Sequence, residues 1–113
     1  MDDKASIRID SILHNIDLVL NYTKGIKIEN LNEDDVLYRG ICFSLAQIGE
    51  QMIVLEKKIG TLYPDLPWHE ARVMRNFIVH DYDKTDINLI ASTIKNDIPQ
   101  LKEAFTKIRD DFK

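Results

Sequence analysis

The chain has 113 residues, which is long enough for one domain with one hydrophobic core but not for two. Its 44% hydrophobic and 30% charged residues are ordinary for a globular protein, and no apolar run approaches the ~20 residues that span a bilayer. The net charge of −4 argues against a broad surface for nucleic-acid backbones, which is usually basic, but not against a small site built from a few arginines.

The N-terminal residues 1–4 are acidic and lack the apolar core of a signal peptide, which favours the cytoplasm. The single cysteine, Cys42, has no partner for an internal disulfide, and its apolar neighbours indicate a buried, unreactive thiol. With one cysteine and three widely spread histidines, the sequence has no zinc-binding pattern, and it has no glycine-rich phosphate loop either. We therefore expect neither a metal ion nor a cofactor.

The first predicted element is a helix over about residues 4–24, ended by Gly25. Its apolar residues recur at spacings of three and four and form one stripe: Ile9, Ile12, Leu13, Ile16, Val19 and Leu20. An acidic loop over residues 27–34 follows.

A long helix is predicted from about Glu33 to Ile59, with Gly60 ending it. Its apolar residues keep the helical spacing for more than three heptads, as in a helical bundle: Leu37, Ile41, Leu45, Ile48, Met52, Leu55 and Ile59. Gly40 and Gly49 each weaken a helix by about 1 kcal/mol relative to alanine. We interpret both glycines as marks of close approach between helices.

Two prolines make a stiff turn before the third helix, in which Pro67 is suited to the first helical position. This helix is expected to run to about His80, and Trp68 to anchor it to the core. A polar turn from Asp81 to Thr85 comes next. Three residues are candidate N-caps of the helix that follows: Asp83, Thr85 and Asp86.

From Ile87 onward, helical spacing returns in a last set of apolar residues: Ile90, Ile94, Ile98, Leu101, Phe105, Ile108 and Phe112. Pro99 interrupts this pattern without changing its phase, which predicts one kinked helix or two abutting helices. No segment alternates with period two. The predicted fold is all-α, an antiparallel up-and-down bundle of four to five helices in a single domain over residues 1–113.

The chemically distinctive stretch is residues 75–82, at the end of the third predicted helix. Arg72, Asn76 and His80 stack on one helical face, since they are four residues apart. Arg75 and His80 are five residues apart and therefore roughly 140° apart around the helix. They cannot face one small group unless the helix ends near His80 or two copies meet across a symmetric interface. Arg72, Arg75, Asn76 and His80 share an outward arc of the helix with Val79, and the apolar residues Val73, Met74, Phe77 and Ile78 occupy the other arc.

The chemistry of this stretch suits RNA cleavage without a metal. His80 can exchange protons near neutral pH, and Arg75 can grip a phosphate through two parallel hydrogen bonds. Asn76 can orient either partner. The plainer interpretations remain open, because a histidine at a helix end is more often a cap or a solvated residue, and Tyr82 is as readily a tyrosine at the edge of the core.

The order Arg75, four residues, His80, one residue, Tyr82 resembles the Arg-x4-His-x-Tyr signature of the HEPN superfamily, and in particular the HepT-like toxins. The proline-proline-tryptophan segment over residues 63–68 and the Ile-Gly-Glu segment at residues 48–50 are similar to segments of that family. The resemblance covers nearly the whole chain. It implies a helical bundle that forms a homodimer, with the two motifs facing each other in a cleft at the interface.

The resemblance also implies a function. HepT-like proteins are metal-independent endoribonuclease toxins of type VII toxin–antitoxin systems, and their antitoxin is a minimal nucleotidyltransferase of the MntA type. By this resemblance Arg75 and His80 are the catalytic pair, Asn76 supports them, and Tyr82 accepts AMP from ATP. An anionic phosphodiester on Tyr82, two residues from His80, would pair with Arg75 and fill the RNA phosphate site.

Two alternatives accompany this interpretation. The chain is a catalytically inactive binding module, or a substrate-positioning subunit of a nucleotidyltransferase, which the acidic net charge favours somewhat. Otherwise it is a purely structural dimer.

Overall fold

The computed structural model describes residues 3–81 and 86–111, and every regular element in these ranges is helical. The elements in chain order are α1 (Asp3–Tyr22), the 3₁₀ helix η1 (Ile28–Glu33), α2 (Asp35–Ile59), α3 (Trp68–Asp81), α4 (Ile87–Ser92), the π-helical turn η3 (Thr93–Asp97) and α5 (Ile98–Asp111). This confirms the predicted all-α bundle of four to five helices. The predicted acidic loop contains η1. None of the described helices is long and apolar enough to cross a membrane.

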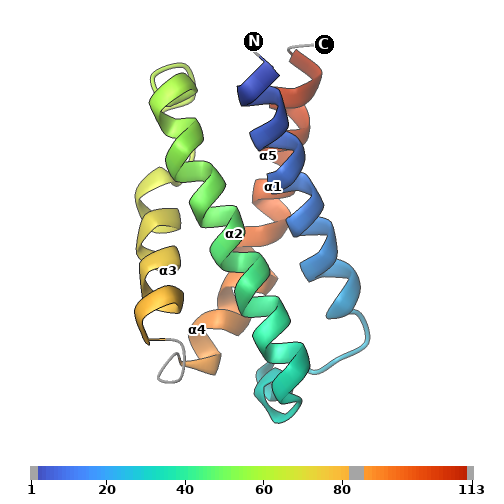
Figure 1. Ribbon diagram of the computed structural model, residues 1–113. Coiled ribbons are helices and arrows are strands. Elements are labelled where there is room, and N and C mark those ends of the chain that lie inside the picture. Colours follow the sequence, from blue (N-terminus) through green and yellow to red (C-terminus); the bar gives the residue numbers. More distant parts are fainter. Residues whose placement is uncertain (1–2, 82–85, 112–113) are drawn as a thin grey trace.

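The helices form an up-and-down arrangement around α2 (Figure 1). α2 packs against α1 on one side and α3 on the other, and α1 also packs against α5. α1 begins and α5 ends at the same end of the bundle. α3 makes its main contact with α2 and few contacts with the run from α4 to α5. It is therefore the least enclosed long helix of the bundle.

The predicted apolar stripes form the core. Most of their residues are buried, including Ile9, Ile12, Ile16 and Val19 of α1, Ile41, Leu45, Ile48, Met52, Leu55 and Ile59 of α2, and Ile98, Leu101, Phe105 and Ile108 of α5. Cys42 is buried as predicted, and this burial raises the pKa of its thiol. Phe112 lies outside the described residues.

Trp68 anchors α3 as predicted. Its ring meets the ring of Phe105 edge-on, with centroids 6.4 Å apart, and its indole Nε1 donates a hydrogen bond to the Tyr63 carbonyl at 2.9 Å. This buries the ring while satisfying its one polar group.

Local chemistry sets the helix ends. Gly25 has φ +73°, the left-handed conformation that favours glycine after a helix. The Asp34 carboxylate accepts the Leu37 N–H at 3.1 Å and caps α2. Among the three candidate caps of α4, Asp86 accepts the Asn88 N–H at 2.8 Å, whereas Asp83 and Thr85 lie outside the described residues.

Pro99 explains the π-helical turn between α4 and α5. Proline has no N–H, and its ring clashes with the carbonyl four residues earlier in an ordinary α-helix. In η3 the Ile98 N–H donates to the carbonyl of Thr93, five residues back, and this wider turn accommodates the proline. The run from Ile87 to Asp111 is thus two abutting helices joined by a turn that carries Thr93 and Asp97.

The two glycines inside α2 behave differently. A Cβ atom at Gly49 would lie 2.8 Å from the Ala71 carbonyl oxygen and 2.8 Å from the Arg75 Cβ, so this glycine permits the close packing of α3 on α2. The prediction of a close approach is correct here. It is wrong for Gly40 within the described chain, because a Cβ there would meet nothing within 4 Å.

Candidate active site

Arg75 lies in the seam between α3 and α2. Its Cβ passes over Gly49, and its Nε is 3.5 Å from the Glu50 Oε2. That Nε is buried and makes no hydrogen bond, so the contact with Glu50 is an ion pair only. The side chain as a whole is 29% exposed, which leaves part of it open to solvent. The helix interface therefore fixes the stem of Arg75, while Glu50 partly neutralises its charge.

Arg72, one turn earlier on α3, also pairs with a carboxylate of α2, and here the guanidinium Nη1 donates a hydrogen bond to the Glu56 Oε1. These two arginines thus face two carboxylates, and the four charges sum to zero. The seam is not a cationic patch, so a phosphate that binds there must share or replace a carboxylate. The sequence reasoning missed Glu50 and Glu56 as partners, although Glu50 belongs to the Ile-Gly-Glu segment at residues 48–50.

His80 and Asn76 are exposed on α3. α3 stays helical from Trp68 to Asp81, so Arg75 and His80 remain roughly 140° apart around its axis. Arg75 leans onto α2, whereas the His80 side chain is exposed to solvent. α3 ends one residue after His80, with His80 still inside the helix, so helical geometry directs the two side chains to different sides of α3 in one copy of the chain. Tyr82 lies outside the described residues.

The two predicted arcs of α3 need correction. Arg75 was placed on the outward arc, yet it is half-buried against α2, because Gly49 leaves room for its stem. Val73 and Phe77 were placed on the apolar arc, yet they are 50% and 37% exposed. Ile78 is the only one of the four apolar residues of that arc that is buried. α3 packs on α2 with a narrow face, so part of its apolar arc stays open.

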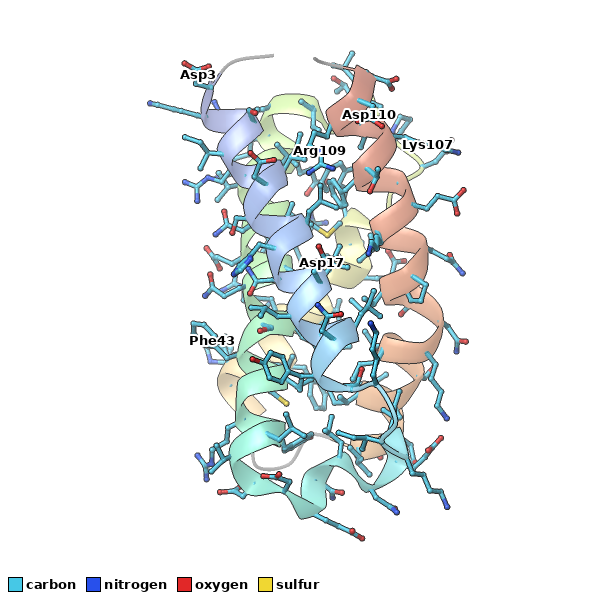
Figure 2. All side chains as sticks on the ribbon, turned by 90° about the vertical axis from the view of Figure 1, so that its right-hand side faces the viewer. Asp3, Asp17, Phe43, Lys107, Arg109 and Asp110 are labelled. Carbon is cyan, nitrogen blue, oxygen red and sulfur yellow. The ribbon has the colours of Figure 1, made fainter. Side chains whose placement is uncertain are left out.

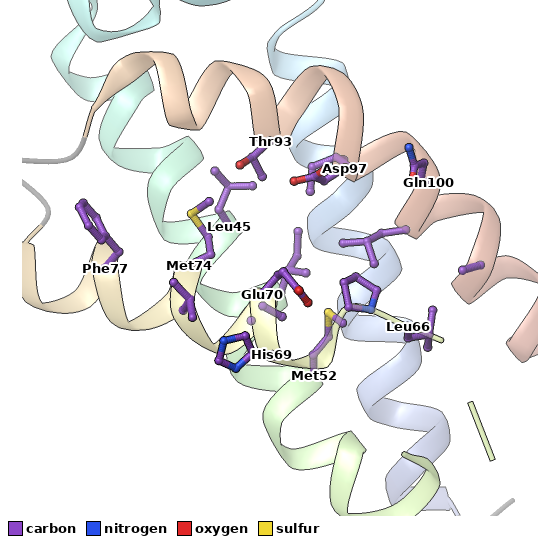
Figure 3. Close-up of a pocket in the computed structure, with 18 of the residues that line it drawn as sticks. Leu45, Met52, Leu66, His69, Glu70, Met74, Phe77, Thr93, Asp97 and Gln100 are labelled. Carbon is purple, nitrogen blue, oxygen red and sulfur yellow. The ribbon is translucent and has the colours of Figure 1, made fainter. Parts of the chain in front are cut away.

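That open arc faces a groove of about 670 Å³ (Figure 3). α3 forms one wall and the run from α4 to α5 the other, while Leu45, Ile48 and Met52 of α2 lie between them. Neither Arg75 nor His80 lines this groove.

In residues 3–81 and 86–111, no three histidine, cysteine or acidic side chains are grouped so that they could hold a metal ion.

The fold and the candidate site define a class of protein: a small helical bundle with an arginine, an asparagine and a histidine on its least enclosed long helix. The family model described as ribonuclease HepT-like matches residues 12–108. The chain belongs to this family. The match includes the whole motif stretch.

Individual relatives agree with the family. The chain is 31% identical over 101 residues to "Probable ribonuclease HepT" of Thermococcus cleftensis, covering 89% of this chain and 92% of that protein. Relatives from Caldanaerobacter subterraneus and Methanocaldococcus jannaschii, both named provisionally as RNases, are each 31% identical over 100 residues. These alignments cover 88% of this chain and 89% and 83% of the two relatives. No solved structure gives a significant match.

Proposed function

We propose that this chain is a metal-independent endoribonuclease toxin that cleaves RNA in a cleft between two copies of itself. Family membership and the RNase names of its relatives support the activity. The observation that carries the dimeric site is the separation of Arg75 and His80 on a continuous helix, which leaves the pair incomplete in one copy. The proposed compartment is the cytoplasm, where RNA is the substrate.

The proposed chemistry uses few groups. His80 accepts the proton of the ribose 2′-hydroxyl as that oxygen attacks the adjacent phosphate, or it protonates the leaving 5′-oxygen. Arg75 neutralises the charge that develops on the phosphoryl oxygens. Asn76 lies on the exposed side of α3 next to Arg75 and orients the phosphate. Glu50 holds Arg75 in place until RNA binds.

The proposed dimer face is the outward stripe of α2 together with the adjoining side of α3. Val36 and Phe43 are 81% and 63% exposed on this stripe, and Figure 2 shows Phe43 projecting away from the bundle. Gly40 lies between them with open space above it. Val79 of α3 is 56% exposed. The exposed Arg39–Asp35 ion pair borders these apolar side chains and adds no net charge, so a second copy of an acidic chain can cover this surface.

Antiparallel packing puts these residues near the seam. Phe43 precedes Gly49 by six residues, about 9 Å along α2, and Val79 follows Arg75 by four residues, about 6 Å along α3. Because the helices are antiparallel, both residues lie on the same side of the point where Gly49 contacts Arg75. A dimer across this face therefore brings the seam of one copy toward the C-terminal end of α3 in the other.

The RNase activity is tested with purified protein and RNA in EDTA. We expect cleavage by the wild-type chain and loss of at least a hundredfold in His80→Ala, as for removal of a general acid or base. His14→Ala is the matched control, because His14 is an exposed histidine of α1 with no neighbours of this kind. Equal cleavage by His80→Ala would identify a contaminating nuclease.

The proposed regulation is AMP transfer onto Tyr82 by an MntA-type nucleotidyltransferase, the cognate antitoxin of a type VII system. The support is the motif order alone, since Tyr82 is outside the described residues. Co-expression with the nucleotidyltransferase should raise the intact mass of the chain by whole AMP units, and Tyr82→Phe should remove this gain. Unchanged mass in the wild-type chain would overturn the proposal.

A second candidate function is a non-enzymatic nucleotide-binding module. It is favoured by one observation: the net charge of −4 opposes a broad surface for RNA backbones but leaves room for one small nucleotide site. Titration calorimetry separates the two functions. Tight binding of ATP or AMP by a chain that does not cleave RNA would support the module.

A further inference from the structure

The groove beside α3 has a buried apolar floor and partly exposed apolar sides. Leu45, Ile48 and Met52 are buried core residues at its base, and Val73, Phe77 and Leu89 are 50%, 37% and 43% exposed along its sides. In a single chain these three apolar side chains are left partly uncovered. A groove of this size and lining is typical of binding sites rather than of solvent-facing surface.

The groove also has charge of one sign. Glu70 of α3 and Asp97 of η3 face each other from opposite walls (Figure 3), and Asp65 also lines the groove. No lysine or arginine is among the residues that line it, although the chain has 15 such residues. Burial raises the pKa of Asp97, and the charge of Glu70 raises it further. The two carboxylates thus repel each other with no cation between them.

The π-helical turn is what aims Asp97 at α3. An extra residue in the turn shifts the phase of the helix before Pro99, and Thr93 and Asp97 both line the groove. π-helical turns are rare and recur at functional sites. The π-helical turn thus places Asp97 on one wall, and an ordinary position in α3 places Glu70 on the other.

We propose that this groove binds an amphipathic helix of a partner protein, with apolar side chains against Val73, Phe77 and Leu89, and a lysine or arginine between Glu70 and Asp97. The α3 wall runs from His69 to Phe77, about 12 Å, which matches two turns of a bound helix with anchors at i, i+3 or i+4, and i+7. The cation offsets the repulsion that the empty groove carries.

A second copy of this chain is a poorer occupant. The chain has a net charge of −4, so a copy would bring further negative charge to the acidic walls. The proposed dimer face lies elsewhere, on the outward stripe of α2. The groove is thus left free in the dimer, and the inference does not depend on RNA cleavage.

The test uses the full chain and a fluorescent synthetic helix of 14 residues with leucines on one face and lysines flanking them. The control is the same peptide with every lysine replaced by glutamate. Fluorescence anisotropy should show binding of the lysine peptide only. The double variant Glu70→Gln/Asp97→Asn should weaken this binding about tenfold, as expected for the loss of two partly exposed charge contacts. Val73→Arg should weaken it at least as much.

The matched control is Asp10→Asn/Glu33→Gln, which removes the same charge from exposed residues away from the groove and should bind like wild type. Equal binding of both peptides, or equal loss in the control and the groove variant, would overturn the proposal. A change in oligomeric state of Val73→Arg by light scattering would also overturn it, since it would make the groove the dimer face. RNA cleavage by the groove variants should stay at the wild-type level, so failure here is distinguishable from failure of the proposed function.

Discussion

Arg75 shows how a single residue serves structure and proposed chemistry together. Its stem fills the space that Gly49 leaves, and its Nε is buried beside Glu50. An arginine held in this way loses little side-chain freedom when it binds a phosphate, because its first torsions are already fixed. The cost is competition, since the Glu50 carboxylate opposes any anion that approaches the same guanidinium.

Glu50→Gln tests this balance. We expect KM for RNA to fall by about two- to fivefold, the size of one partly exposed ion pair, because the competing charge is gone. We expect kcat to fall as well, because Arg75 is no longer aimed. Steady-state kinetics on one RNA substrate measures both. Glu103→Gln, an exposed pair partner of Lys107 on α5, is the control and should change neither constant. A rise in kcat would show that Glu50 only obstructs the site.

At the scale of elements, the contact between α2 and α3 depends on one position. Gly49→Ala should lower the free energy of unfolding by about 1–3 kcal/mol, the usual cost of overpacking, because its Cβ would lie 2.8 Å from the Ala71 carbonyl oxygen. Gly40→Ala is the matched control on the same helix. Its Cβ meets nothing within 4 Å, so it should raise stability by up to about 1 kcal/mol through helix propensity. Urea denaturation compares the two, and equal effects would contradict a tight seam.

Asp97, on one wall of the groove, should make the stability of the fold depend on pH. Asp97 has a raised pKa in the folded chain, so the folded state binds its proton more tightly than the unfolded state does. Its contribution to stability is therefore greatest below the ordinary aspartate value of 3.8, and it falls as pH rises toward the raised pKa. Asp97→Asn should remove this fall and become relatively more stable than wild type with rising pH.

The difference between wild type and Asp97→Asn is the quantity to measure, by urea denaturation at several pH values from acid to neutral. Other carboxylates act in the opposite sense. The hydrogen bond from Lys95 lowers the pKa of Glu29, so stability from that pair is lost on acidification. A difference that stays constant with pH would mean that neither burial nor the charge of Glu70 raises the pKa of Asp97.

Much of the fold was predictable, because apolar residues that recur at helical spacing are enough to identify the buried face of each helix. Apolar residues such as Ile16, Met52 and Phe105 recur at helical spacing and are buried. The site was less predictable, because it depends on where α3 sits relative to α2. The identity of residue 49 decides that a polar residue, Arg75, faces the seam. The groove depends on the π-helical turn before Pro99. The proline can be read from the sequence, but the direction in which the turn leaves the next helix cannot.

For the whole molecule, two surfaces of different chemistry flank α3. The outward stripe of α2 carries exposed apolar side chains such as Phe43 beside the Arg39–Asp35 ion pair, and this surface suits an identical copy. The groove on the other flank is apolar with acidic walls, which suits a cationic partner. Separating the proposed self-association from the proposed partner binding in this way would let the proposed dimer bind a partner helix without coming apart. The proposed active site, at the edge of the first surface, is then a property of the assembly.

The assembly can be tested by mixing two inactive variants, Arg75→Ala and His80→Ala. If each site takes Arg75 from one copy and His80 from the other, a mixed dimer contains one intact site and one doubly damaged site. After unfolding and refolding together, half of the dimers are mixed, so activity should return to about a quarter of wild type.

If both residues act within one copy, no intact site forms and the mixture stays inactive. Phe43→Asp placed in both variants is the control. It introduces a charge at the proposed dimer face, so it should yield monomers by light scattering and abolish the recovery. Recovery that survives in monomers would contradict a shared site, whereas recovery that requires the dimer would show that the arginine and the histidine cooperate across the interface.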